Sequence, residues 1–230
     1  MKILVLAALT IAPVLLFAQE KYVSVNQETQ VLSQGAKSVF RSEIFYNKEL
    51  DAVVTHHTYP SEFIKLANRF GELKIYFPQT NTVSLTQDES YSTTNELLYY
   101  FINNRQNDLG LRKENFTLVK TKMEEDLVVT TWQAPAGMQA VDQIMIVFRD
   151  SDPIYAEYTD VKGTVLKKIY YSAYENFQTF SLPLRITEIE FLSKADSIIR
   201  LSVFSNPRVS NVPDNSYFNF KVPNNARITQ

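Results

Sequence analysis

Short runs in which apolar and polar residues alternate recur along the sequence, and the stretch FGELKIYFPQTNTVSL at 70–85 is one example. Leu73, Ile75 and Phe77 fall on one face of an extended chain, and the residues between them fall on the other. The Pro-Gln-Thr-Asn sequence after Phe77 is typical of a turn. We therefore predict a β-hairpin with one apolar face, and the rest of the chain decides what that face contacts.

The same alternation extends over most of the chain, with turn residues between the runs. Clear hairpin pairs are 37–46 with 50–59, 116–123 with 127–133, and 142–150 with 153–160, and two further runs follow at 183–191 and 197–205. In total we expect about eleven antiparallel strands, so the fold is mainly β with a minor helical part (α+β). A sheet of this size has to curl, because the twist of its strands accumulates. Lys65, Lys74 and Arg200 interrupt apolar runs, which indicates one solvated face.

One helix is predicted among the strands. The segment TTNELLYYFINNR at 93–105 begins with Thr93 and Glu96 at the spacing of a capping box. Four apolar residues then repeat with the helical period and form one stripe: Leu97, Leu98, Phe101 and Ile102. A single helix covers only part of the inner face of a large sheet. That face is therefore either packed solid by side chains or left as a cavity under the helix.

The first residues have the pattern of a secretory signal. Lys2 precedes an almost entirely apolar run, and Ala18 supplies a small residue at the expected cleavage position. We predict a signal peptide at 1–18 and a single domain at 19–230. The apolar run is short for a membrane span, so the mature protein is expected to be periplasmic and not membrane-spanning. Because the sequence has no Cys, export brings neither disulfide bonds nor a lipid-acceptor residue.

Composition narrows the classes of partner. Of the 230 residues, 45% are hydrophobic and 21% are charged, which is typical of a globular domain. The formal net charge of −2 provides no large basic field, so we expect no nucleic-acid partner.

Few residues are suited to catalysis or metal binding. His56 and His57 are the two histidines, and neighbours on a strand point to opposite faces, so they cannot share one metal ion. The isolated glycines form no phosphate loop, and there is no nucleophile elbow. We expect no metal, no cofactor and no enzymatic activity.

One enzymatic alternative stays open at Glu188 and Glu190. Residues two apart on a strand share a face, so their carboxylates lie roughly 7 Å apart, which suits a glycosidase. A solvated charged face is the simpler interpretation. Trp132, the sole Trp, is suited either to core packing or to ligand contact.

Three segments follow an order of elements that one protein family shares. YPSEFIKLANRFGELKIYFPQTNTV at 59–83 gives a strand ending in Pro, a second strand, a Gly hairpin, an aromatic strand and a Pro turn. The segment 144–171 gives paired middle strands, and SYFNFKVPNNARI at 216–228 gives a last short strand that ends at Pro223. In this order, from about residue 35 to 228, the chain resembles the LolA-like periplasmic lipoprotein carriers.

The resemblance implies a fold and a function. The fold is a curled antiparallel half-barrel with a helical lid over a hydrophobic cavity. The cavity shelters the acyl chains of lipoproteins that cross the periplasm. The implied partners are acylated lipoproteins or other lipids, a releasing transporter at the inner membrane and an acceptor at the outer membrane. Neither a cofactor nor covalent chemistry is implied.

The sequence departs from the family at two places. The family usually has a helix before its first strand, whereas residues 21–34 show no firm helical stripe. Its best-known members also have an Arg near the start of the second strand that holds the lid shut. The nearest match here is Lys48, which makes point-charge contacts instead of a forked, bidentate contact. Lys48 is therefore only a possible lid latch.

Apolar residues on the predicted strands are candidates for the cavity lining. The candidates are Ile64, Leu66, Leu73, Ile75, Phe77, Trp132, Ile144, Ile146 and Phe148. Core packing is the alternative for each of them, and a shift of one residue in register would move a strand's candidates to the other face. The helix stripe Leu97, Leu98, Phe101 and Ile102 is the candidate lid.

Lid and ligand would compete for one apolar surface. Each buried CH₂ contributes about 0.8 kcal/mol, so a long acyl chain offers on the order of 10 kcal/mol. The helix stripe would occupy the same surface when no ligand is bound. The net affinity for the ligand is then the difference between the free energies with which the ligand and the helix bind that surface. The alternatives are a binding module for another amphiphile and a non-enzymatic scaffold for envelope assembly, because a fold does not fix a function.

Overall fold

The computed structural model describes residues 20–193 and 196–229, so the predicted signal peptide at 1–18 lies outside the described residues. Within the described part, one sheet contains 14 strands in the order β14-β6-β5-β4-β3-β2-β1-β13-β12-β11-β10-β9-β8-β7. The first seven are β1 (Tyr22–Ser33), β2 (Ala36–Asn47), β3 (Ala52–Tyr59), β4 (Phe63–Ala67), β5 (Glu72–Phe77), β6 (Thr82–Gln87) and β7 (Thr117–Glu124). The others are β8 (Leu127–Gln133), β9 (Gln143–Arg149), β10 (Asp152–Thr159), β11 (Val165–Asn176), β12 (Ser181–Phe191), β13 (Ser197–Ser210) and β14 (Arg227–Thr229).

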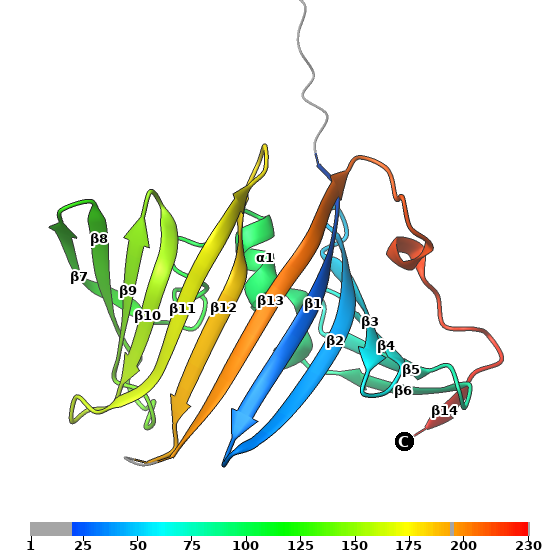
Figure 1. The fold of residues 1–230 in the computed structure, drawn as a ribbon, viewed down its shortest axis with the longest axis horizontal. Helices are drawn as coiled ribbons and strands as arrows, with labels where there is room; N and C mark the ends of the chain where they lie inside the picture. The colour runs from blue at the N-terminus through cyan, green and yellow to red at the C-terminus, as the bar shows by residue number, and fades with distance from the viewer. Residues whose placement is uncertain (1–19, 194–195, 230) are drawn as a thin grey trace, which may run out of the picture.

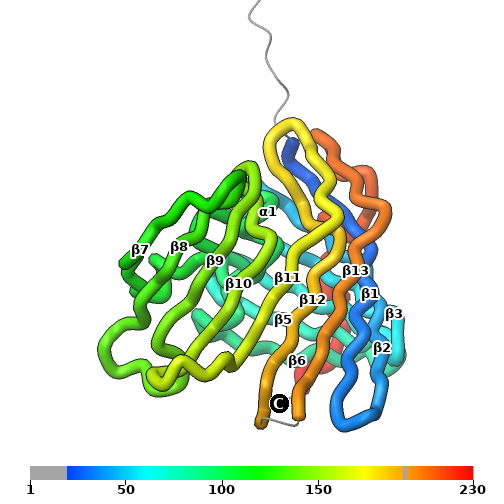
Figure 2. The backbone as a smooth tube through the Cα atoms, turned by 60° about the vertical axis from the view of Figure 1, so that its left-hand side comes forward, coloured from blue at the N-terminus to red at the C-terminus, as the bar shows by residue number. Residues whose placement is uncertain are grey.

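The order of the strands explains where the helix lies. All neighbouring strands are antiparallel except β14, which pairs in parallel with β6. The chain builds the sheet outward from β1 to β6, then restarts at the opposite edge with β7 and returns to β13, which pairs with β1. The connection from β6 to β7 must therefore span the sheet. It crosses the concave inner face and contains α1 (Leu97–Ile102), as Figure 1 and Figure 2 show.

The predicted mainly β, curled antiparallel sheet is confirmed, although details differ. The described residues contain 14 strands instead of about eleven, and residues 22–33 form a strand, β1, where the family pattern has a helix. The aromatic tail does not form the predicted strand up to Pro223. It forms a 3-10 helix, η3 (Ser216–Asn219), and the short strand β14 follows it.

The helix is shorter than predicted, because its first turns are not α-helical. The 3-10 helices η1 (Glu89–Tyr91) and η2 (Thr93–Asn95) precede it. The predicted capping box is absent from this segment. Thr93 Oγ1 instead donates to Asp51 O at 2.6 Å, and Glu96, at the N-cap, makes no capping hydrogen bond with its side chain. No helix among the described residues is both long and apolar enough to pass through a bilayer.

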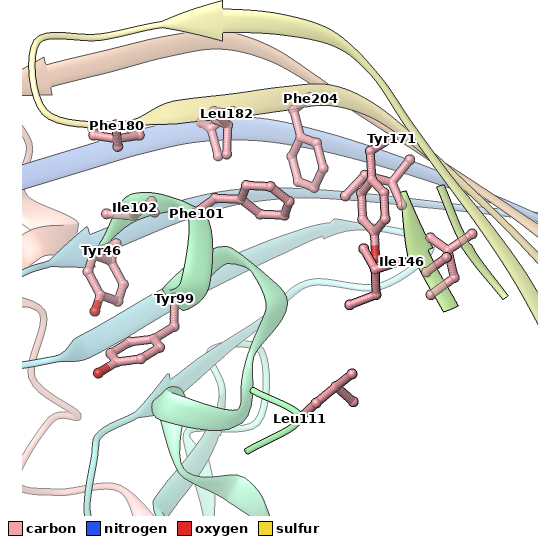
Figure 3. Packing of buried hydrophobic residues seen from close by; sticks show 14 of the residues in the cluster. Tyr46, Tyr99, Phe101, Ile102, Leu111, Ile146, Tyr171, Phe180, Leu182 and Phe204 are labelled. Atoms are coloured by element: carbon pink, nitrogen blue, oxygen red, sulfur yellow. The ribbon is translucent and has the colours of Figure 1, made fainter. Parts of the chain in front are cut away.

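One part of the concave face is packed solid. Phe101 and Ile102 of α1 are buried, with exposures of 0% and 1%, and Phe101 packs near Leu182, Phe204 and Tyr171 (Figure 3). Burying a large apolar side chain contributes about 1.5–3 kcal/mol, so these two residues fix the helix to the sheet. The same core extends under the connection that follows α1, through Leu111 and Phe116.

The C-terminal segment covers part of the convex face. Tyr217 stacks on Phe45 with ring centroids 5.1 Å apart, and Phe218 meets Tyr22 edge-on at 5.1 Å. Phe45 and Phe218 belong to a second apolar cluster on this face. The segment therefore shields the outer surface of β2–β5.

Candidate functional site

The concave face has an unfilled part beside the packed core. Two adjoining cavities of about 330 Å³ and 530 Å³ lie there, and both are lined by Gln27, His57 and Arg200. The first is lined further by Ile44, Thr55, Lys65, Glu96, Leu97, Leu98, Ile186, Glu188, Ser202 and Phe204. The second is lined further by Thr29, Val31, Ser38, Phe40, Ser42, Tyr59, Pro60, Ser61 and Phe63. We call the two cavities together the hollow.

The hollow exists because its floor carries short side chains. The short residues are Thr29, Ser38, Ser42, Thr55 and Ser202. Where the concave face is packed solid, β8, β11 and β12 present Trp132, Tyr171 and Leu182, which are at most 3% exposed. The same sheet face is thus filled where its residues are large and open where they are small.

Strand alternation brings the lining residues to one face. On β1, Thr29 and Val31 share a side, and Thr29 is paired with Phe40 on β2 and with Ser202 on β13. His57 on β3 faces Phe63 on β4, and their rings stack with centroids 4.0 Å apart. Val31, Phe40 and Phe63 make the second cavity an aromatic and aliphatic slot.

Charged side chains occupy the first cavity. Lys65 Nζ lies 3.0 Å from Glu96 Oε1, which joins β4 to the start of α1. Arg200 and Glu188 are paired in register on β13 and β12 and form an ion pair. Lys167 Nζ contacts the other Glu188 oxygen at 3.3 Å. Both carboxylate oxygens of Glu188 are thus held by cations, which does not favour a role in protonating a leaving group.

The two ends of α1 are attached to the sheet by polar contacts. At its start, Glu96 contacts Lys65 as above. At its end, Asn103 Nδ2 donates to the Tyr46 hydroxyl at 2.9 Å, and that hydroxyl donates to Asp51 Oδ1 at 2.9 Å. Burial raises the pKa of Tyr46 well above its ordinary value, so the phenol stays protonated and able to donate.

Comparison with known proteins supports the fold. No protein-family model matches the chain, and no curated protein sequence gives a significant match. Among solved structures, the chain is similar to a LolA superfamily protein from Nitrosomonas europaea, with 14% identity, coverage of 86% of this chain and 90% of that one, and a TM-score of 0.55. It is also similar to an outer-membrane lipoprotein-sorting protein domain from Vibrio parahaemolyticus, with 12% identity, 86% and 89% coverage and a TM-score of 0.57. A DUF1329 family protein from Desulfovibrio piger gives 12% identity, 86% and 90% coverage and a TM-score of 0.58.

The chain has a LolA-like fold. The resemblance inferred from the order of elements is therefore confirmed at the level of fold.

Four of the predicted lining residues lie in the packed part of the LolA-like sheet. Trp132, Ile144, Ile146 and Phe148 are at most 6% exposed and belong to the concave-face core under α1 and the connection after it. They are on the inner face, as expected, but their surface is already covered by the protein. In this structure the alternative of core packing describes them.

The β4–β5 hairpin does not place its five predicted lining residues on one face, so the prediction is wrong for two of them. Ile64 pairs with Tyr76 and Leu66 pairs with Lys74, so Ile64 and Leu66 share the convex face with those residues and pack in the convex cluster. Leu73, Ile75 and Phe77 face the other way. They share the concave face with Lys65, beyond the residues that line the hollow.

The predicted lid residues do lie over the concave face. Leu97 and Leu98 line the hollow, whereas Phe101 and Ile102 are buried in the core. Lys48 contacts a different element. Its Nζ donates to Thr179 Oγ1 at 3.4 Å and lies 5.2 Å from the Phe180 ring centroid, so it joins the β2–β3 turn to the β11–β12 turn and not to α1.

The two histidines have separate environments, as strand geometry predicts. His56 Nε2 lies 3.0 Å from Glu62 Oε1, and its ring stacks on Tyr217 on the convex side. His57 lines the hollow, and burial, aided by Lys65 and His56, lowers its pKa from 6.5 to about 4. The described residues include no group of three or more His, Asp or Glu that could hold a metal ion.

Replacing Tyr46 with Phe should loosen the end of α1. The variant removes a hydroxyl from a residue that is 1% exposed and leaves Asp51 and Asn103 without this partner. We expect the free energy of unfolding to fall by about 1–3 kcal/mol in urea denaturation. Tyr170→Phe, at a half-exposed site, is the control and should change it by less than about 0.5 kcal/mol. Equal effects of the two substitutions would contradict the assigned role of Tyr46.

His57 should make the protein less stable in mild acid. Between the ordinary pKa of 6.5 and the folded value of about 4, the unfolded chain binds the proton that folded His57 does not, so the free energy of unfolding falls as pH falls. Because the side chain is only half-buried, we expect a loss of roughly 1–2 kcal/mol over this window. Urea denaturation of wild type and His57→Gln across the window should show a smaller loss in the variant. Parallel curves would show that His57 does not titrate in this way.

Proposed function

We propose that the protein carries acyl chains in the periplasm, sheltering the lipid part of a lipoprotein in the hollow on its way to the outer membrane. One observation carries the proposal, namely a continuous hollow on the concave face whose second cavity is bounded by Val31, Phe40 and Phe63. Both cavity volumes fall within the range of about 300–1,000 Å³ that is typical of small-molecule sites. The LolA-like fold adds to this support.

The energetics suit a carrier that needs no cofactor or covalent step. Ten buried CH₂ groups contribute on the order of 8 kcal/mol, which is enough to keep a chain out of water. Release of the chain requires another interaction that offsets part of this free energy. Leu97 and Leu98 line the hollow from the start of α1, so this end of the helix can occupy the surface that the chain vacates. Phe101 and Ile102 stay in the core and act as the anchor.

The proposal includes a location and partners. A signal peptide at 1–18, cleaved near Ala18, would deliver one domain at 19–230 to the periplasm. There the carrier would receive its cargo from a releasing transporter at the inner membrane and deliver it to an acceptor at the outer membrane. The competing functions are binding of another amphiphile and service as a scaffold in envelope assembly.

Filling the hollow should abolish binding of an apolar chain. Thr29→Phe adds a ring to the floor, next to Phe40 and Ser202. Gln30→Phe adds the same ring to the neighbouring residue of β1, on the opposite face, and serves as the control. We expect Thr29→Phe to weaken binding of the neutral fluorescent probe N-phenyl-1-naphthylamine at least about tenfold, and Gln30→Phe to leave it unchanged.

Mass spectrometry of organic extracts from natively purified protein identifies the cargo. Acylated lipoproteins support carriage, other amphiphiles support the first competing function, and an empty hollow that binds no probe would overturn both. Equal probe binding by Thr29→Phe and Gln30→Phe would place the site outside the hollow.

A further inference from the structure

The hollow has a charged band where its two cavities meet. Arg200 lines both cavities, and Lys65 lines the first. A slot for an aliphatic chain alone gains nothing from cations, because charges favour water over hydrocarbon. The band is therefore suited to a ligand that has a polar end as well as an apolar chain.

The band has more donor capacity than its carboxylates use. Glu188 is shared by two cations, Arg200 and Lys167, and Glu96 pairs with Lys65. The lining of the hollow thus holds two cations, Arg200 and Lys65, and two carboxylates, of which Glu188 is shared with a third cation outside the lining. Arg200 is 44% exposed at its side chain and has five N–H donors, of which the Nη1 group contacts Glu188. A planar guanidinium with free donors is well suited to bind a carboxylate or a phosphate.

Two neighbours of Arg200 at the junction, His57 and Gln27, do not oppose an anion, and the carboxylate of Glu188 is already paired with Arg200 and Lys167. His57 is neutral at neutral pH, because burial lowers its pKa to about 4, and Gln27 carries an amide that can donate. From this junction the second cavity extends toward Val31, Phe40 and Phe63. The junction and the second cavity can thus hold the polar end and the apolar chain of one ligand side by side.

We propose that the polar end of the ligand is anionic, that Arg200 binds its carboxylate or phosphate at the junction, and that Lys65 attracts it from the first cavity while its chain lies along Phe40 and Phe63. This inference rests on the part of the proposed function that places an acyl chain in the hollow. Because the acyl chains of a lipoprotein are joined by uncharged ester and amide bonds, an anionic end favours a fatty acid or a phospholipid as the ligand. It also couples the ligand to the helix. An anion at Lys65 competes with Glu96, which the ion pair holds at the start of α1.

Competition between chains with different ends tests the inference. Dodecanoate, dodecyl phosphate, dodecanol and dodecylamine are titrated at neutral pH against N-phenyl-1-naphthylamine bound to the purified full chain. We expect at least one of the two acids to displace the probe about tenfold more strongly than dodecanol, with the stronger acid showing whether carboxylate or phosphate is preferred. Acids no stronger than dodecanol, or dodecylamine as the strongest competitor, would overturn the inference.

Variants locate the anion site. Arg200→Gln and Lys65→Gln should each reduce the ratio of acid to dodecanol affinity, whereas Arg200→Lys should retain part of it, because it keeps the charge but loses the forked contact. Glu96→Gln should raise the ratio, because it removes the competitor for Lys65. Lys74→Gln, on the convex face of the same hairpin, is the control and should leave the ratio unchanged. An unchanged ratio in both Gln variants of Arg200 and Lys65, with thermal unfolding confirming that they fold, would contradict the assignment.

The test separates this inference from the proposed function. If none of the four compounds displaces the probe and the probe itself does not bind, acyl-chain binding fails. If all four bind with equal affinity, acyl-chain binding stands and the anion site fails.

Discussion

The sizes of the side chains on one face of the sheet determine the rest of the structure. A sheet of 14 strands curls, and its inner face must be covered or left open. Trp132, Tyr171 and Leu182 fill that face on one side and give Phe101 a place to pack. Thr29 and Ser202 leave it open on the other side. One helix of six residues then covers the boundary between the packed and the open part.

Much of the fold could be predicted from the sequence. Alternation with period two identifies strands without knowledge of their partners, so most hairpins and the curled sheet could be predicted from the sequence. The strand β1 was missed because its concave-facing residues, such as Gln27 and Thr29, are polar and do not alternate with a strong apolar contrast. The prediction of a strand in the aromatic tail was wrong because its aromatic residues do alternate strongly. Phe218 has the spacing of a strand residue but packs from a 3-10 helix onto the convex face.

The candidate site was harder to predict from the sequence, because the hollow is open where the side chains of the sheet are small. Searching for large apolar residues found Ile144 and Phe148, which fill space, and overlooked Ser38 and Thr29, which leave it. The feature of the sequence that could have located the site was the set of cations within apolar strands. Lys65 and Arg200 face the hollow, whereas Lys74 faces the convex side, and only the register between strands separates them.

A crystal structure with a terminally brominated fatty acid tests the central claim most directly, because bromine can be located by its anomalous scattering. We expect a bromine peak in the open part of the concave face between Phe40 and Phe63, with the two ends of the ligand on either side of His57. A bromine peak in the convex groove beside Leu66 and Phe220 would contradict it, as would a chain that reaches the concave face only after Phe101 has left the core.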